Sequence, residues 1–422
     1  MGPLLALIYL NDLDGVTDND LFFFADDTIL FKSHRHNSGD AVTSLQTDID
    51  RIKTYGDKWD IKFNSSKTIQ QTFTNRRTQN APNLRFGDKP IPLVETHKHL
   101  GLTLSTSLRF HDHVNDIVKK VNGTLGPLYP IAKFIPRHIL SKIYATYVRP
   151  FFDYSDIVYH GHLTVADMTR LERLQNRAAR LTTGALLRTP TDKLLTDLGW
   201  TSLRTRRDIN CATYLYKIMN SRFCAPEYLT NVLPPKRDQI NFHTLRNPTH
   251  ISIPPSRLSS YRNSFIPSAV RSWNRLSQET RNKPSLMTFK RAVLHEYGVQ
   301  RPSLFFSYGS KENNILHTRL RLEASLLKTH LFRLYPNKVQ STACACGCPF
   351  ETNNHFFFIC PLYQIPRVEL NRVLISIIPD YSNLSVKEKI CVILSGSGLN
   401  AGDGLAVANA VQRFIVKSQR FC

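Results

Sequence analysis

Two adjacent carboxylates, Asp26 and Asp27, are the first residues whose types and spacing could do chemistry. They lie between the apolar runs 22–24 and 28–31, which we interpret as two buried strands joined by a tight turn. Two carboxylates beside apolar strands are costly unless their charge is compensated, and aspartate supplies the hard oxygen ligands that divalent cations prefer. The turn therefore predicts metal-assisted chemistry, and the alternative is a solvated turn, where Asp is also favoured.

A second group combines cysteines and a histidine near the C-terminus. It consists of Cys344, Cys346 and Cys348, followed by His355 and Cys360. Three thiolates and one imidazole suit a tetrahedral zinc ion, and four protein ligands would leave no open position for catalysis. The spacing predicts a structural zinc site, with unrelated free thiols as the alternative.

A third group is a row of arginines at helical spacing. Arg170, Arg173, Arg177 and Arg180 recur at intervals of three, four and three residues, which places their guanidinium groups on one helical face. A nucleic-acid backbone would relieve the repulsion between them and release counterions. The pattern predicts a nucleic-acid-binding face, and a solvated face partly balanced by Glu172 is the alternative.

Four segments in a fixed order resemble the reverse transcriptases of non-LTR (LINE-type) retrotransposons. They are the apolar segment 2–13, the turn Phe24-Ala25-Asp26-Asp27, the segment Asn64-Ser65-Ser66-Lys67-Thr68, and Lys98-His99-Leu100-Gly101-Leu102. In that family they correspond to the helix before the catalytic hairpin, the F/Y-A-D-D turn, a lysine-bearing motif and the primer-grip hairpin. His99 departs from the family, which often has an aromatic residue there.

The resemblance implies a polymerase that uses two Mg²⁺ ions, an RNA template, a DNA primer or target, and dNTPs. It makes Asp26 the main metal ligand and Asp27 its helper. Lys67 becomes a candidate for contacting phosphate or assisting proton transfer, with a solvated surface lysine as the alternative, and Lys98 becomes a candidate nucleic-acid contact. The C-x-C-x8-H-x4-C spacing also resembles the zinc knuckle of these proteins.

That second resemblance implies zinc ligands Cys344, Cys346, His355 and Cys360, and Cys348 is a spare thiol that could replace Cys344 or Cys346.

The family's fingers region and first catalytic Asp would precede Met1. Asp12 and Asp14 match the end of the first helix and do not replace that carboxylate. We therefore expect a truncated polymerase that is inactive alone, with its catalytic hairpin left as an exposed apolar edge. The alternatives are a non-catalytic nucleic-acid-binding protein derived from a retrotransposon, and a decayed remnant.

The elements that must position these residues predict an α+β fold. The resemblance implies that residues 1–108 are a partial palm, residues 109–232 a mainly helical thumb and residues 301–422 a C-terminal zinc-knuckle module, and we expect residues 233–300 to be a basic linker and connecting region. We expect a helix with the apolar stripe Leu45, Ile49, Ile52 and Trp59, strands at 67–74 and 97–104, and a turn at Gly87-Asp88. Ser385 and Glu388 predict a capping box that opens a helix ending at Gly396.

Composition agrees with a folded protein that binds a polyanion. The chain has 422 residues, is 41% hydrophobic and carries a formal net charge of +22. No apolar run approaches the ~18 to 20 residues that cross a bilayer, so we expect no membrane association. We find no targeting signal, and we expect the intracellular location, nuclear and cytoplasmic, of the parent element.

Overall fold

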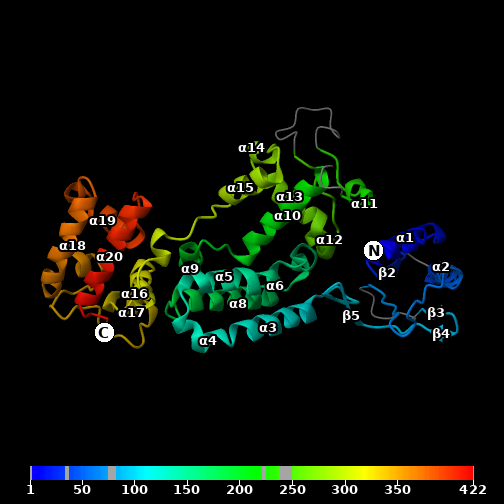
Figure 1. Cartoon of the computed structure of the whole chain (residues 1–422), viewed down its shortest axis with the longest axis horizontal. Helices are drawn as coiled ribbons and strands as arrows, with labels where there is room; N and C mark the ends of the chain where they lie inside the picture. Colours follow the sequence, from blue (N-terminus) through cyan, green and yellow to red (C-terminus); the bar gives the residue numbers. More distant parts are fainter. Residues whose placement is uncertain (1, 34–37, 75–81, 221–224, 237–249, 422) are drawn as a thin grey trace. The chain divides into compact units, whose positions relative to one another are not determined.

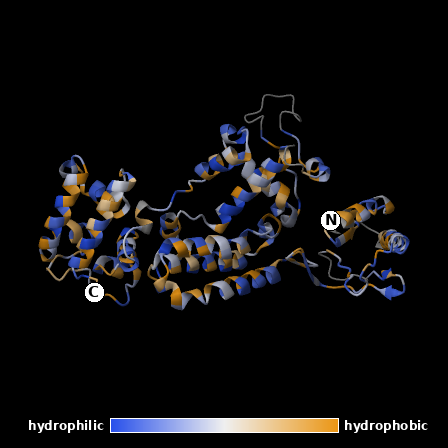
Figure 2. Cartoon of the chain, in the orientation of Figure 1, coloured by the Kyte–Doolittle hydropathy of each residue, from blue (hydrophilic) through white to orange (hydrophobic). Residues whose placement is uncertain are grey.

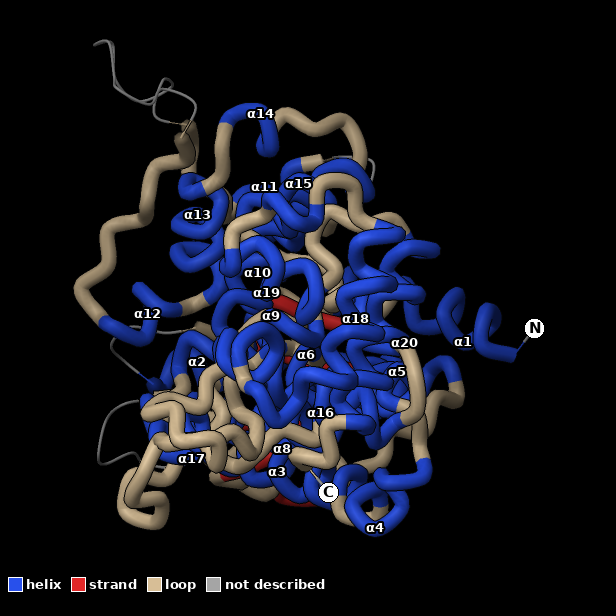
Figure 3. Tube along the Cα trace, turned by 90° about the vertical axis from the view of Figure 1, so that its left-hand side faces the viewer, coloured by secondary structure: helices blue, strands red, loops and turns tan. Residues whose placement is uncertain are grey.

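The computed structural model describes residues 2–33, 38–74, 82–220, 225–236 and 250–421 (Figure 1). The chain divides into two compact units, residues 1–113 and 114–422. The first unit contains all six strands found among the described residues, and the second unit is built from helices and connecting loops. Figure 3 shows how far helices outnumber strands.

The first unit contains two longer helices and three separate antiparallel hairpins. Its elements are α1 (Gly2–Asn11), the short turn η1 (Asp14–Val16), β1 (Asp20–Phe24), β2 (Asp27–Phe31), α2 (Ser38–Trp59), β3 (Arg85–Phe86), β4 (Lys89–Pro90), β5 (Thr96–His99) and β6 (Leu102–Ser105). The hairpins predicted at Asp26, at Gly87-Asp88 and within 97–104 are therefore confirmed.

Two expectations for this unit were wrong. The strands flanking Asp26 are not buried, because β1 and β2 pair only with each other in the described part of the chain. The hairpin is instead an exposed apolar edge, as expected for the truncated polymerase. Leu21 is their one buried residue, and Phe24 is 63% exposed. The segment 67–74 is not a strand: after a turn at Asn64–Thr68, it makes only an isolated bridge at Gln70.

α2 contributes a buried residue to each of two apolar clusters in this unit. Ile49 and Ile52 are buried as the stripe predicts, whereas Trp59 is 44% exposed and packs at the helix end against Tyr9. Asp48, on the same helix, is buried and accepts the backbone N–H groups of Asp18 and Asn19. This carboxylate fixes the loop that leads into β1.

The second unit begins with helices of very different lengths. They are α3 (His111–Leu125), α4 (Leu128–Ile131), α5 (Arg137–Ile143), a π turn η3 (Tyr144–Val148), α6 (Arg149–Asp153), α7 (Asp156–Tyr159), α8 (Val165–Thr183), α9 (Thr191–Leu198), α10 (Leu203–Met219) and α11 (Glu227–Asn231). Single-turn 3-10 segments at Ala132–Phe134 and His160–His162 connect some of them.

The rest of the chain is also helical. It contains α12 (Ser259–Asn263), α13 (Phe265–Arg275), α14 (Gln278–Arg281), α15 (Leu286–Glu296), η7 (Leu304–Ser307), α16 (Lys311–Arg321), α17 (Lys328–Leu334), η8 (His355–Ile359), η9 (Pro361–Tyr363), α18 (Gln364–Ile377), η10 (Tyr381–Asn383), α19 (Val386–Ser395) and α20 (Ala401–Lys417). Figure 2 shows hydrophobic and hydrophilic residues mixed along most of these helices, as expected of amphipathic helices.

Among the described residues, three apolar clusters that hold these helices together are clearly defined. One joins α10, α13 and α15 around Trp273 and Phe289. A second joins α8 and α9 to the segment 306–334. The third lies in the C-terminal part and gathers α18, α19, α20 and the aromatic rings of Phe356 and Phe357. In the parts of the chain that are described, no helix combines the length and apolarity needed to cross a bilayer.

The predicted helix after Ser385 is confirmed. The Ser385 side chain accepts the N–H of Glu388 and the Glu388 carboxylate accepts the N–H of Ser385, which completes the capping box at the start of α19. Gly396 ends the helix with φ +70°. Residues 237–249 of the predicted linker and connecting region lie outside the described residues. The limits predicted for the four domains stay predictions.

A buried ionic cluster joins α5, α9 and α16. The Asp197 carboxylate accepts from Arg321 Nε at 2.6 Å and from Arg137 Nη2 at 3.4 Å. Arg137 also donates to Asn314 and, at 2.6 Å, to Thr318 Oγ1. Thr318 and Arg321 of α16 therefore connect this helix to α5 and α9.

Candidate functional site

Asp26 and Asp27 lie at the tip of the β1–β2 hairpin. Phe24 pairs with Asp27 across the ladder, so Ala25 and Asp26 form a two-residue turn. Ala25 has φ +54°, in the left-handed region that non-glycine residues rarely adopt. Both carboxylates are exposed, and adjacent exposed oxygens fit the ligand preference of Mg²⁺. This backbone presents two hard ligands side by side.

The two lysines named from sequence lie on other elements of the same unit. Lys67 is exposed in a turn that Asn64 organises, with the Asn64 carbonyl accepting the N–H of Lys67 at 3.1 Å. Lys98 is exposed on β5, opposite Thr103. No ion pair among the described residues links either lysine to Asp26 or Asp27, so the structure does not bring these four side chains into one contact network.

The β5–β6 hairpin has an unusual turn. Its two central residues, Leu100 and Gly101, have φ +45° and φ +82°. Two positive φ values in a two-residue loop are typical of a type I′ turn, which glycine adopts easily and leucine does not. The segment that matches the primer grip is therefore held in a strained, sharply defined turn.

The cysteines and the histidine form one compact group. Cys344, Cys346, His355 and Cys360 place their ligand atoms within 4.8 Å of one another. Cys344 Sγ lies 3.8 Å from Cys360 Sγ, and Cys346 Sγ lies 3.2 Å from His355 Nε2. A tetrahedral zinc ion with Zn–S near ~2.3 Å places its ligand atoms at similar separations. This group can hold a metal ion.

A tight loop brings Cys344 and Cys346 to the same side. The Cys344 N–H donates to the Cys348 carbonyl at 2.8 Å, and Gly347 has φ +93°. The Cys348 thiol donates to the Phe350 carbonyl at 3.7 Å and lies outside the group of four. The structure therefore selects Cys344 and Cys346 from the three cysteines that sequence left open.

Charged residues outside the ligand set support this loop, and sequence reasoning did not identify Glu351 and Arg420 among them. The buried carboxylate of Glu351 lies 3.9 Å from Cys344 Sγ and accepts two bonds from Arg420, at 2.6 and 2.7 Å. Arg367 donates to the Cys360 carbonyl at 2.6 Å. Burial raises the pKa of Cys360, so a cation is needed to keep this thiol ionised at neutral pH.

The four arginines lie on α8 as predicted, but they have different environments. Arg170 donates to Asn115 and Arg177 donates to Asn122, each at 2.9 Å, so both tie α8 to α3. Arg173 is exposed, whereas Arg180 is half-buried. Two of the four guanidinium groups are thus engaged in helix packing, which the spacing alone could not distinguish from nucleic-acid binding.

Comparison with known proteins points to transposon polymerases. No family model matches the chain. The chain is 28% identical over 194 residues to a probable RNA-directed DNA polymerase from transposon X-element of Drosophila melanogaster, which is 44% of this chain and 21% of that protein. It is 25% identical over 198 residues to the RNA-directed DNA polymerase from mobile element jockey of the same species, with the same shares.

The jockey polymerase of Drosophila funebris is also 25% identical, over 201 residues. The matches thus span about a fifth of the length of these relatives. The similarity confirms the resemblance that the motifs indicated: this chain is related to the reverse transcriptases of non-LTR retrotransposons.

Proposed function

We propose that this chain supplies part of a retrotransposon RNA-directed DNA polymerase, with the β1–β2 hairpin as its catalytic turn. The exposed carboxylate pair Asp26-Asp27 at a strained two-residue turn carries the proposal. The first unit would be part of the palm, and the helices from α3 to α10 would be the thumb. The similarity to transposon polymerases supports the polymerase assignment, and the order of the motifs supports the palm and thumb assignments.

Asp26 would hold Mg²⁺, with Asp27 beside it. The bound ions would activate the primer 3′-hydroxyl and stabilise the leaving pyrophosphate. Such chemistry uses a further carboxylate. The described residues contain only one group of three or more potential ligands, the cysteine and histidine cluster, so the Asp26-Asp27 pair by itself is an incomplete two-metal site. We expect activity only when another segment provides the missing ligand.

Complementation tests this proposal. The purified chain with Mg²⁺, an RNA template, a DNA primer and dNTPs should show no processive extension. Fusion to the fingers and first palm segment of a related transposon polymerase should restore it. Failure of a well-folded fusion to extend any primer would contradict the proposal, and so would Asp26-dependent extension by the chain alone.

The Cys344, Cys346, His355 and Cys360 group would hold a structural zinc ion. Its four ligand atoms fit a tetrahedral ion, and the supporting bonds from Arg420 and Arg367 fix the surrounding loops. Metal analysis should give about one zinc per chain. Cys360→Ser should remove it, and the matched control Cys348→Ser should retain it. Equal zinc content in both variants would refute this ligand set.

A non-catalytic role in nucleic-acid binding is the second candidate. The net charge of +22 favours it, because a polyanion would neutralise the excess. RNA and DNA are the partners expected in either case. Binding that is unaffected by Asp26→Ala, together with inactivity of every fusion, would favour this second function.

A further inference from the structure

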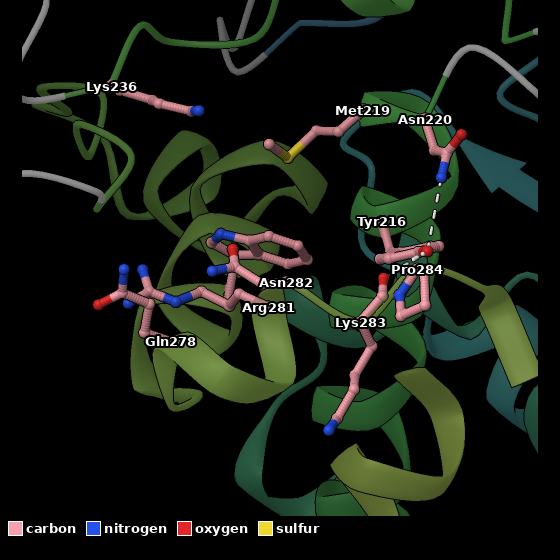
Figure 4. Close-up of a pocket in the computed structure, with 10 residues that line it drawn as sticks. Tyr216, Met219, Asn220, Lys236, Gln278, Arg281, Asn282, Lys283 and Pro284 are labelled. Atoms are coloured by element: carbon pink, nitrogen blue, oxygen red, sulfur yellow. Dashed lines mark hydrogen bonds between the residues drawn. The ribbon is translucent and has the colours of Figure 1, made fainter. Parts of the chain in front are cut away.

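A polar cavity in the second unit lies outside all the residues discussed above as sites. It is about 510 Å³ in volume and opens between the end of α10, Lys236, and the segment from Trp273 to Pro284 that contains α14 (Figure 4). Cavities of roughly 300–1,000 Å³ hold ligands of the size of a nucleotide. The cavity is therefore large enough for one unit of a nucleic-acid chain.

The charge that lines the cavity is positive. Lys236, Arg281 and Lys283 line it, and no carboxylate is found among the lining residues that the structure describes. The Nζ of Lys283 pairs with exposed Glu279 at 2.8 Å. In Figure 4, Lys236 and Arg281 lie on different sides of the opening. A single anionic group bound in the cavity would be approached by two cations.

Backbone bonds hold Lys236 in place. Lys236 forms an isolated bridge with Ile251, and the Asn274 side chain bonds both the N–H and the carbonyl of Ile251, at 3.0 and 2.8 Å. Asn274 belongs to α13, as does Trp273. The position of Lys236 is therefore coupled to the helix that forms one wall of the cavity.

Aromatic rings give the cavity a rigid floor. Tyr216 stacks on Phe289 with ring centroids 4.3 Å apart, and Trp273 lies 5.6 Å from the same ring. The Tyr216 hydroxyl donates to the Lys283 carbonyl at 2.9 Å, which fixes the loop after α14. This wall is preorganised and has little freedom to lose when a ligand binds.

Amide side chains complete the lining. Gln278 and Asn282 are exposed at the rim. An amide can both donate to and accept from the edges of any base. Burial lowers the pKa of Arg281, against the opposing effect of Glu296, and a bound anion would offset the burial. Cations, amides and an apolar wall together match a phosphate joined to an unpaired base.

We propose that this cavity binds a single-stranded segment of RNA or DNA, with a phosphate between Lys236 and Arg281 and a base at Gln278 and Asn282. A duplex keeps its bases stacked inside and could not place one in a cavity of this kind. The proposal deepens the proposed function and rests on it for its biological role, because template and displaced strands are single-stranded.

Binding of a short single-stranded oligonucleotide to the full chain tests the proposal. Replacing both cations (Lys236→Ala with Arg281→Gln) should lower the slope of log affinity against log salt by about 0.7, the value for one phosphate contact on a single strand. The matched control removes two exposed cations of α15 that do not line the cavity, Lys290→Ala with Arg291→Gln, and should leave the slope unchanged. Lys236→Glu alone, at an exposed position, gives the same test with the least risk to folding.

RNA and DNA oligonucleotides are compared, and binding of either one supports the proposal. Equal loss in the cavity and control variants would overturn it, and so would no loss in either. Equally effective competition by a duplex or by polyglutamate would show a site for any anion and would also overturn it. Binding is measured without polymerase activity, so the two proposals are tested independently. Failed complementation would not contradict the cavity proposal, and unchanged binding by the cavity variants would not contradict the polymerase proposal.

Discussion

Removing the carboxylate of Asp197 should destabilise the helical unit more than removing any surface charge. Asp197 lies between Arg137 and Arg321. The side chains of Asp197 and Arg137 are each 2% exposed, and that of Arg321 is 8% exposed. In Asp197→Ala both guanidinium groups stay buried without their counterion. Burial already lowers the pKa of Arg137 to about 10 with Asp197 present, so the site is unfavourable to an unpaired charge.

The expected cost follows from this burial. Breaking a buried ion pair by removing one partner costs about 3–5 kcal/mol. Arg137 keeps its bonds to Thr318 and to the Thr182 carbonyl, and Arg321 keeps its bond to the Leu394 carbonyl. These remaining acceptors place the cost near the lower limit, at about 3 kcal/mol.

Urea unfolding at pH 7, followed by far-UV circular dichroism, measures this cost. The matched control is Lys193→Ala, which removes a pair with Glu323 between the same two regions of the chain. Those side chains are 36% and 46% exposed, so the control should cost less than about 1 kcal/mol. Equal costs for the two variants would refute the conclusion that the buried cluster holds α9 and α16 together.

Two further predictions concern the first unit and α8. Burial, the largest single effect, raises the pKa of Asp48, but hydrogen bonds from Asp18 and Asn19 together hold it below its usual value. The Asp48 carboxylate therefore contributes fully to the free energy of unfolding above its unfolded pKa of about 4, and this contribution is lost as pH falls through the folded pKa. Asp48→Asn should cost about 1–3 kcal/mol at pH 7 in urea unfolding and progressively less in acid, and a cost that does not change with pH would contradict this. On α8, Arg170→Gln with Arg177→Gln should lower the thermal unfolding midpoint, because the hydrogen bonds to α3 are lost. Arg173→Gln should leave the midpoint unchanged and weaken RNA binding. Identical effects of the two variants would indicate that the arginines act together as one binding face.

The candidate sites with local signals could be predicted from sequence. The Asp26-Asp27 turn, the capping box at Ser385 and the cysteine and histidine group all involve residues close along the chain, where turn chemistry and spacing restrict the geometry. The ion pairs that sequence reasoning missed join residues far apart along the chain. Arg420 contacts Glu351 across 69 residues and Arg321 contacts Asp197 across 124, and no local pattern records such pairs.

Burial was the other limit of sequence reasoning. The apolar runs 22–24 and 28–31 have the composition of buried strands, yet whether a hairpin is covered depends on which strand lies beside it. Trp59 continues an apolar stripe by spacing and still ends 44% exposed, because α2 ends there. Periodicity identifies the face of a helix, and only the packed structure shows where that face stops being covered.

Single-turnover primer extension by the completed enzyme tests the central claim most directly. In a fusion that restores extension with Mg²⁺, Asp26→Asn removes one metal-ligand charge, and Asp20→Asn changes an exposed aspartate at the opposite end of the same hairpin. We predict that Asp26→Asn slows extension at least about a hundredfold while primer binding and the Asp20→Asn control stay unchanged. Full activity of Asp26→Asn would contradict the assignment of this turn as the catalytic metal site.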